Sequence, residues 1–252
     1  MYIANTYSTN TLLREMLAKG EWPEGEHYLY AGYQTAGRGQ TGNGWESEEG
    51  KNLLCSIVIK STEQRAKNKD KRPFYLNVAI SVAVYRTING LGVSGLGIKW
   101  PNDIYWQDKK VAGILIENAL IGNEVKYSIA GIGLNVNQTK FQSDAPNPVS
   151  LKQITGTDFV VKELMQRLYA EVQKALDEDV WEEYKAHLYR REGFWPFVER
   201  EVSTAPTMNA GKDTPGAFMA QIEDILPTGE IVLRDKKGKQ RIYHFKQIRY
   251  VL

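Results

Sequence analysis

The sequence has almost no cysteine, no long apolar run and no excess of charge of either sign. A single cysteine, Cys55, excludes an internal disulfide and a zinc site built from several cysteines. Its place in the apolar run LLCSIVI predicts a buried core residue. No apolar stretch approaches the ~20 residues of a membrane-spanning helix, and MYIANTYSTN lacks the features of a signal peptide. We therefore expect a cytoplasmic protein with no membrane partner.

Charge gives no general case for nucleic-acid binding, because 32 basic and 30 acidic residues leave a net charge of +2. A local exception is residues 63–72, EQRAKNKDKR. This run is either a patch for a polyanion or, as we expect, a solvated loop between a strand and a helix. With 252 residues, 42% of them hydrophobic, the chain can bury a sizeable core.

Hydrophobic periodicity predicts the elements. A first helix is expected after the capping residues 8–10 and before its terminator Gly20, and further helices over residues 74–89 and 159–189. Strands are expected over residues 27–33 and 52–60, and a meander of short antiparallel strands over 96–137. The long helical region has a break near residues 177–179, and residues 138–157 have the composition of a loop.

Beyond about Gly193 the pattern of apolar and polar residues changes to that of short alternating strands, with turns at residues 227–230 and 235–239. This pattern predicts a small β-barrel. We therefore expect an α+β protein with a mixed or antiparallel sheet flanked by helices in residues 1–192, and a small β-barrel domain in residues 193–252.

A glycine-rich segment, QTAGRGQTGNGW, follows the first predicted strand at residues 34–45. Four glycines alternate here with polar side chains, among them Arg38, Gln40 and Asn43: the glycines are Gly37, Gly39, Gly42 and Gly44. Glycines let the backbone approach a ligand closely, and arginine is a forked cation suited to carboxylate or phosphate. The segment is neither a Walker A loop nor a dinucleotide fingerprint. Taken alone, the pattern fits a phosphate-binding loop and a flexible surface loop equally.

The run KWPND places a lysine at the end of a predicted strand. Lys99 faces opposite to Ile98 and Trp100, and a Pro-Asn-Asp turn follows. If this face lines a pocket, Lys99 is a fixed cation beside a reacting phosphate. If the face is open, Lys99 is a solvated surface residue, and the residues alone leave both interpretations open.

Four motifs occur in the order GRGQTGNGW, KWPNDI, KKVAGILIE and GIGLNVN. Together they closely resemble the biotin protein ligase family over residues 5 to about 190, with a weaker match beyond. The resemblance implies a catalytic domain like that of class II synthetases and an SH3-like C-terminal barrel. It also implies that biotin is activated with ATP and Mg²⁺ to biotinyl-5′-AMP and is then transferred to a lysine of a biotin carboxyl carrier domain.

The resemblance assigns roles residue by residue. Lys99 and Arg38 match the family's catalytic cations, which neutralise the biotin carboxylate and the phosphate. The implied biotin site is Ser8, Thr9, Asn10, Gln34, Gly37, Arg38, Gly39, Gln40, Trp45, Lys99, Gly113, Gly131 and Gly133. The implied ATP site is Arg38, Trp45, Lys99, Asn102 and Asn135. Asp103 either orients the acceptor lysine or accepts its proton, or it caps the Pro-Asn-Asp turn. No metal ligand is assigned.

Two departures from the family pattern change the expectations. Gln40, Thr41 and Asn43 stand where much of the family has arginines, so retention of the adenylate is expected to depend more on Trp45 and backbone donors. The first ligand motif begins at Ser8, so we expect no DNA-binding winged helix ahead of it and no DNA partner. Monomer and homodimer both remain open.

Two alternative functions are considered against these residues. A lipoate–protein ligase shares the fold and the chemistry, but its RRxSGGGxVYHD pattern is missing from this sequence. A non-catalytic biotin-binding protein is the other alternative. The presence of both Arg38 and Lys99 favours an active enzyme.

Overall fold

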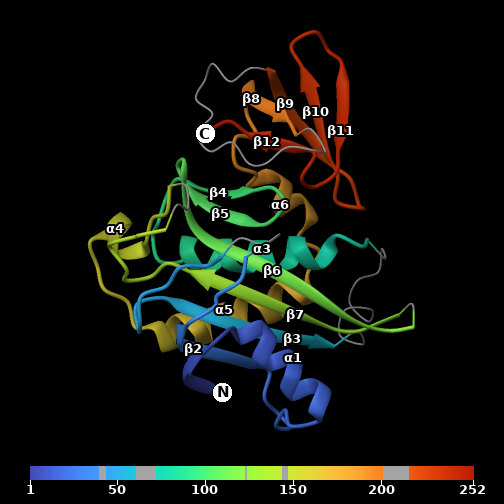
Figure 1. Cartoon of the computed structure of the whole chain (residues 1–252). Coiled ribbons are helices and arrows are strands. Elements are labelled where there is room, and N and C mark those ends of the chain that lie inside the picture. The colour runs from blue at the N-terminus through green and yellow to red at the C-terminus, as the bar shows by residue number, and fades with distance from the viewer. Residues whose placement is uncertain (40–43, 61–71, 123, 144–146, 201–215) are drawn as a thin grey trace.

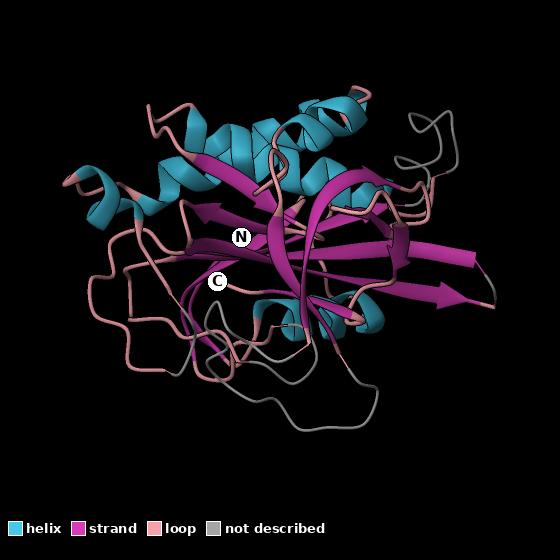
Figure 2. Cartoon of the chain, turned by 90° about the horizontal axis from the view of Figure 1, so that it is seen from above, coloured by secondary structure: helices cyan, strands magenta, loops and turns pink. Residues whose placement is uncertain are grey.

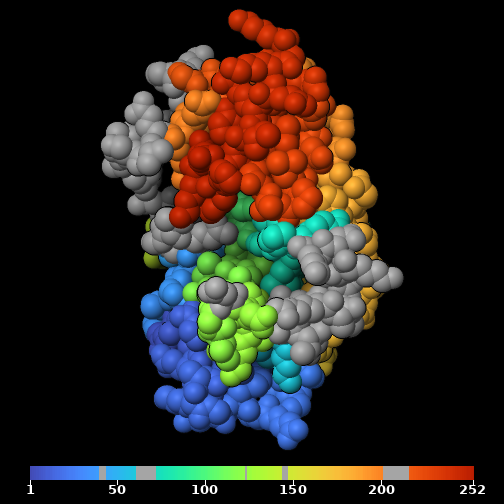
Figure 3. Space-filling model, turned by 90° about the vertical axis from the view of Figure 1, so that its right-hand side faces the viewer, coloured from blue at the N-terminus to red at the C-terminus, as the bar shows by residue number. Residues whose placement is uncertain are grey.

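The computed structural model describes residues 1–39, 44–60, 72–122, 124–143, 147–200 and 216–252. It contains two sheets (Figure 1). The larger has seven strands in the order β1-β2-β3-β7-β6-β5-β4, and the smaller has five in the order β11-β10-β9-β8-β12. The N-terminal residues and the smaller sheet lie at opposite ends of the molecule (Figure 3).

The strands of the larger sheet are β1 (Tyr2–Thr6), β2 (Tyr28–Gln34), β3 (Leu53–Lys60), β4 (Leu96–Lys99), β5 (Asp103–Trp106), β6 (Lys109–Ile121) and β7 (Glu124–Leu134). Those of the smaller sheet are β8 (Trp195–Glu199), β9 (Ala217–Ile225), β10 (Ile231–Asp235), β11 (Gln240–Tyr243) and β12 (Ile248–Tyr250). The helices are α1 (Thr9–Lys19), α3 (Tyr75–Asn89), α4 (Leu151–Thr155), α5 (Val161–Asp177) and α6 (Trp181–Ala186). Strands β1 and β2 pair in parallel and the other ladders are antiparallel, so the predicted fold class is confirmed.

Most predicted elements are confirmed. Helix α1 ends where Gly20 adopts the left-handed conformation with φ 72°, and the predicted break separates α5 from α6. Cys55 is buried, which raises the pKa of its thiol to about 12. The solvated loop predicted at residues 63–72 lies outside the described residues except for Arg72, which pairs with Asp179 at 2.7 Å.

Two elements were not foreseen. Strand β1 was missed because four of its five residues are not buried, so it has no apolar alternation to detect. The prediction of a loop over residues 138–157 was wrong in part, because α4 lies within it. Ser150 and Gln153 form a capping box at the start of α4, which provides partners for backbone groups that so short a helix leaves unpaired.

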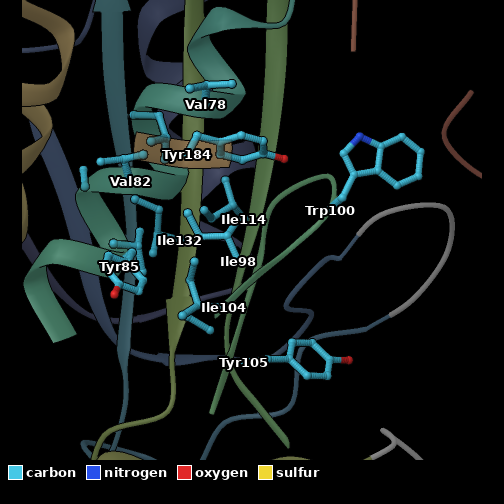
Figure 4. Packing of buried hydrophobic residues seen from close by; sticks show 14 of the residues in the cluster. Val78, Val82, Tyr85, Ile98, Trp100, Ile104, Tyr105, Ile114, Ile132 and Tyr184 are labelled. Atoms are coloured by element: carbon cyan, nitrogen blue, oxygen red, sulfur yellow. The ribbon is translucent and has the colours of Figure 1, made fainter. Parts of the chain in front are cut away.

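The larger sheet has helices on both faces (Figure 2). Alternation along β3 and β7 separates the two faces: Cys55, Ile57 and Ile132 belong to the apolar core beneath α3, while Ser56 and Gly131 point toward α1. Figure 4 shows Ile98, Ile104, Ile114 and Ile132 gathered against Val78, Val82 and Tyr85 of α3. The α1 face therefore remains for polar groups.

One continuous core joins the two sheets, since Phe197, Ile222 and Tyr250 of the smaller sheet belong to the same buried cluster as α3. The turns predicted at residues 227–230 and 235–239 connect β9 to β10 and β10 to β11. A domain boundary between residues 192 and 193 stays a prediction. Among the described residues, no helix is both long enough and apolar enough to span a bilayer.

Candidate functional site

A buried polar network lies where α1 meets the larger sheet. The Gln34 side-chain oxygen accepts hydrogen bonds from the Thr9 backbone N–H at 2.7 Å and the Thr9 hydroxyl at 3.1 Å. The Ser56 hydroxyl lies 2.8 Å from Thr9 Oγ1 and 2.6 Å from Asn10 Oδ1. Ser8 precedes the helix in an extended conformation and is itself buried. The structure thus brings together the four predicted residues at the start of this site.

Beside this network, the surface formed by Gly113, Gly131 and Gly133 of β6 and β7 carries no side chains; we call it the glycine floor. Gly113 of β6 pairs with Gly133 of β7, and Leu115 pairs with Gly131 in the next position on the same face. A Cβ atom on Gly131 would overlap the Asn10 side chain, which shows how closely the amide lies against the strand. The three glycines form a surface without side chains on which a flat ligand ring can lie.

The Trp45 indole lies on this floor. A Cβ atom on Gly133 would overlap the ring, and one on Gly113 would come within 2.9 Å of it. The segment that carries the indole is held by the bond from the Trp45 N–H to the Gly37 carbonyl at 2.9 Å and by a bridge between Arg38 and Gly44. The indole N–H is buried without a partner in the described structure, so it is a donor available to a ligand.

Cationic groups cluster at the end of the floor nearest β4 and β5. Lys110 lies beside the indole, with its ammonium nitrogen 5.7 Å from the ring centroid, and forms a 2.8 Å ion pair with Asp103. Asp103 pairs with Lys99 across the β4–β5 hairpin. A hairpin closed by the Pro-Asn-Asp turn therefore holds one carboxylate between two lysines.

The Lys99 side chain is partly buried, and its ammonium group donates a hydrogen bond to the Tyr105 hydroxyl at 2.9 Å. Burial is the main cause that lowers the pKa of Lys99 to about 8, and the charge of Asp103 opposes this shift. Near neutral pH most of the Lys99 side chains therefore remain charged.

Arg38 does not lie beside Lys99 in this structure. Its guanidinium forms hydrogen bonds with both carboxylate oxygens of Glu117, at 3.1 and 3.0 Å. Glu117 also pairs with Arg14 at 2.5 Å and accepts a hydrogen bond from the Asn10 amide at 2.8 Å. Glu117 and Lys110 are seven residues apart on β6, on the order of 20 Å along a strand. The two predicted catalytic cations thus occupy opposite ends of the floor.

The two predicted asparagines of the ATP site are buried and engaged by the protein. Asn135 donates to the Val149 carbonyl at 3.2 Å, and Asn102 donates to the Asn77 side chain at 3.1 Å. Gly39 is a described loop residue, and Gln40 lies outside the described residues.

Three residues of this arrangement were not singled out from the sequence: Ser56, Lys110 and Glu117. Ser56 is a polar residue inside the apolar run LLCSIVI, which is a signal of a buried partner. Lys110 and Glu117 both belong to KKVAGILIE. Alternation alone places Glu117 on the side of Gly113, whereas Lys110 reaches that side only because of the bulge between β5 and β6, which the sequence does not reveal.

Two hollows in the described part of the chain lie away from this floor. One of about 280 Å³ is lined by residues around Gly97, Asp108 and Arg190, and one of about 250 Å³ is lined by residues around Tyr30 and Gly32. The floor itself is covered by Asn10 and Trp45.

Comparisons with known proteins identify the family. The model of the biotin/lipoate A/B protein ligase family matches residues 2–135, more than half of the 252 residues. The chain is 29% identical over 238 residues to the bifunctional ligase/repressor BirA of Escherichia coli strain K12, covering 90% of this chain and 71% of that protein. It is 32% identical over 152 residues to the biotin–[acetyl-CoA-carboxylase] ligase of Mycobacterium tuberculosis, covering 59% of this chain and 53% of that one.

A solved biotin protein ligase from Aquifex aeolicus, in complex with biotin and ATP, has a similar fold. It superposes with a TM-score of 0.74 at 21% identity, covering 99% of this chain and 98% of that one. The family model matches more than half of the sequence, and the relatives match along most of it. The chain therefore belongs to the biotin/lipoate A/B protein ligase family.

Proposed function

We propose that this protein is a biotin protein ligase, which activates biotin with ATP and transfers it to a lysine of a biotin carboxyl carrier domain. The observation that carries the proposal is the order of groups along one floor. A polar network fit for a urea ring lies at one end, around Asn10, and two lysines with a carboxylate lie at the other, around Lys110. Two relatives, from Mycobacterium tuberculosis and Paracoccus denitrificans, are named biotin–[acetyl-CoA-carboxylase] ligases, which supports the same substrate.

In the first step, a biotin carboxylate oxygen attacks the α-phosphorus of ATP, and the bond to the departing pyrophosphate breaks. Two anions have to meet, so fixed cations lower the barrier. Lys99 and Lys110 are the cations that this structure places together near Asp103. We assign the catalytic role to Lys99 and add Lys110 beside it.

Arg38 can neutralise a carboxylate or phosphate of the ligand only if it leaves Glu117, its partner in this structure. Its guanidinium is exposed enough to leave Glu117, since 41% of its side chain is accessible and an exposed ion pair is weak. Once released, it can neutralise a carboxylate or phosphate that lies over the glycine floor.

In the second step, the neutral ε-amine of the carrier lysine attacks the carbonyl carbon of the mixed anhydride, AMP leaves with the bonding pair, and the proton released from the nitrogen passes to the Asp103 carboxylate or to water. Asp103 is the proposed group that orients this amine. Its ion pair with Lys110 holds the carboxylate at this end of the floor. Asn102 and Asn135 are proposed to line the ATP end through the backbone that they fix.

Magnesium belongs to the proposal only as an ion that ATP brings with it. In the described ranges, no three His, Cys, Asp or Glu side chains gather as a metal site. Mg²⁺ in nucleotide sites is commonly held in large part by phosphate oxygens. No step is derived through it.

The direct test is biotin-dependent exchange of labelled pyrophosphate into ATP. We expect exchange with biotin and at most a trace with lipoate. Exchange with lipoate alone would overturn the choice of substrate, and no exchange with either would overturn the proposed activity.

Biotin binding is expected to move the Trp45 indole, because a biotin ring and the indole cannot both lie on Gly113 and Gly133. Tryptophan emission should therefore change on adding biotin, and the change should vanish in Trp45→Phe. Trp22→Phe is the matched control, since Trp22 bonds to the Glu26 carbonyl away from the floor. An equal response in both variants would contradict this placement.

A further inference from the structure

The ammonium group of Lys99 is enclosed by aromatic rings from both sheets. Its nitrogen lies 4.5 Å from the ring centroid of Tyr105 on β5 and 5.4 Å from that of Tyr250 on β12. Both distances fall within the ~6 Å at which a cation is attracted to a ring. Tyr250 comes from the smaller sheet, 151 positions further along the chain than Lys99.

The Tyr250 ring is itself firmly held. It is buried, and it packs against Phe197 of β8 with ring centroids 4.9 Å apart and against Tyr189 at 6.0 Å. Tyr105 packs against Tyr189 at 5.2 Å. A ring wedged in this way has little freedom to follow a moving lysine, so it defines where the ammonium group can sit.

The charged groups around Lys99 do not by themselves hold it. Those that act on it are Asp103 of β5, Lys110 of β6, Arg190 before β8 and Arg200 after β8. Three of the four are cations. The nearby phenols of Tyr105, Tyr189 and Tyr250 have pKa values raised chiefly by burial, so they remain neutral dipoles near pH 8. The attraction that keeps the ammonium in place thus comes from one carboxylate, one hydroxyl and two rings.

We infer that Tyr250 is a positioning residue: the smaller sheet uses its ring to hold the Lys99 ammonium group against Tyr105, beside the reacting phosphate. The inference rests on the proposed function for its catalytic meaning. It gives the smaller sheet a definite part in the reaction, because any change that withdraws β12 also withdraws one wall of the lysine pocket.

The test measures the pKa of Lys99 directly, by NMR titration of ¹³C-labelled lysine side chains with the Lys99 signal assigned by its loss in Lys99→Met. Tyr250→Phe keeps the ring, and Tyr250→Met fills much of its volume without a π face. We expect a pKa near 8 in the natural protein and in Tyr250→Phe. In Tyr250→Met the charged form loses a partner, so its pKa should fall by about half a unit to one unit.

Tyr243→Met is the matched control, because Tyr243 is buried in the same sheet but contacts Glu199 rather than Lys99. It should leave the Lys99 titration unchanged. The alkaline limb of biotin-dependent pyrophosphate exchange should move with the NMR value, to lower pH in Tyr250→Met alone.

The outcomes separate the two proposals. A Lys99 pKa that is unchanged in Tyr250→Met, or that rises toward 10.5, overturns the positioning role, since a rise means that the ring only excludes water. If the Lys99 pKa shifts as expected but the protein has no exchange activity, the positioning role of Tyr250 stands and the proposed function is overturned.

Discussion

Replacing Lys99 with methionine is expected to abolish biotin-dependent pyrophosphate exchange and, at the same time, to make the protein more stable at pH 7. Loss of a fixed charge beside a reacting phosphate typically costs about 100- to 1000-fold in rate. The gain in stability has a separate cause. Folding places the ammonium group in a partly buried site where its charged form is disfavoured, and methionine removes that penalty.

The gain in stability of Lys99→Met is expected to depend on pH. Lys99 has a pKa of about 8 in the folded protein and near 10.5 when unfolded. Below pH 8 both states carry the proton, and the folded state bears the whole penalty, on the order of 1–2 kcal/mol after allowance for partial exposure. Between pH 8 and 10.5 the unfolded state binds more protons, so the stability of the natural protein rises with pH. The advantage of methionine should shrink over that window.

Urea unfolding of both proteins at pH 7 and pH 10 measures the effect. Lys109→Met is the matched control, because Lys109 is the exposed neighbour of Lys110 on the same strand. It should change neither activity nor stability by much. A Lys99→Met protein that is less stable at pH 7 would contradict the account, since its inactivity could then reflect misfolding.

Gly131→Ala is expected to weaken biotin binding by at least about 100-fold while the protein remains folded. The added Cβ atom would overlap the Asn10 amide, which has to leave its place on the strand. Ser56 and Glu117 would then no longer hold the Asn10 amide where biotin can meet it, and each hydrogen bond lost to the ligand costs about 0.5–1.5 kcal/mol, or more when the ring also loses its seat on the strand. Together these losses correspond to a change in Kd of this size.

Titration calorimetry with biotin measures the loss. Gly44→Ala is the matched control, because the nearest atom to a Cβ there, the Gly37 carbonyl oxygen, is 3.7 Å away. The double variant Gly131→Ala with Asn10→Ala relieves the overlap and should regain stability but not affinity. Biotin binding within threefold of the natural protein in Gly131→Ala would show that Asn10 and the floor are not the biotin site.

Local patterns predicted the parts of the fold that depend on neighbours in sequence. Gly20 marked the end of α1, and the apolar run around Cys55 marked a strand buried on both faces. Strand β1 escaped because an edge strand with exposed side chains has no periodic signal. A short helix such as α4 depends on its cap, which composition alone did not indicate.

In the site, too, the sequence predicted local features but not contacts between segments distant in sequence. The sequence indicated which residue types take part, including the three glycines and both lysine-bearing motifs. It could not predict that Gly113 pairs with Gly133, because strand register depends on the whole sheet. Nor could it predict that Arg38 pairs with Glu117, or that Tyr250 closes the pocket of Lys99, since both contacts join segments distant in sequence.

The most direct measurement of the central claim is the mass of a biotin carboxyl carrier domain incubated with this protein, ATP and either biotin or lipoate. The account predicts one added biotinyl group with biotin, none with lipoate, and none with Lys99→Met. A carrier that gains a lipoyl group instead, or that gains biotin as readily from Lys99→Met, would contradict it.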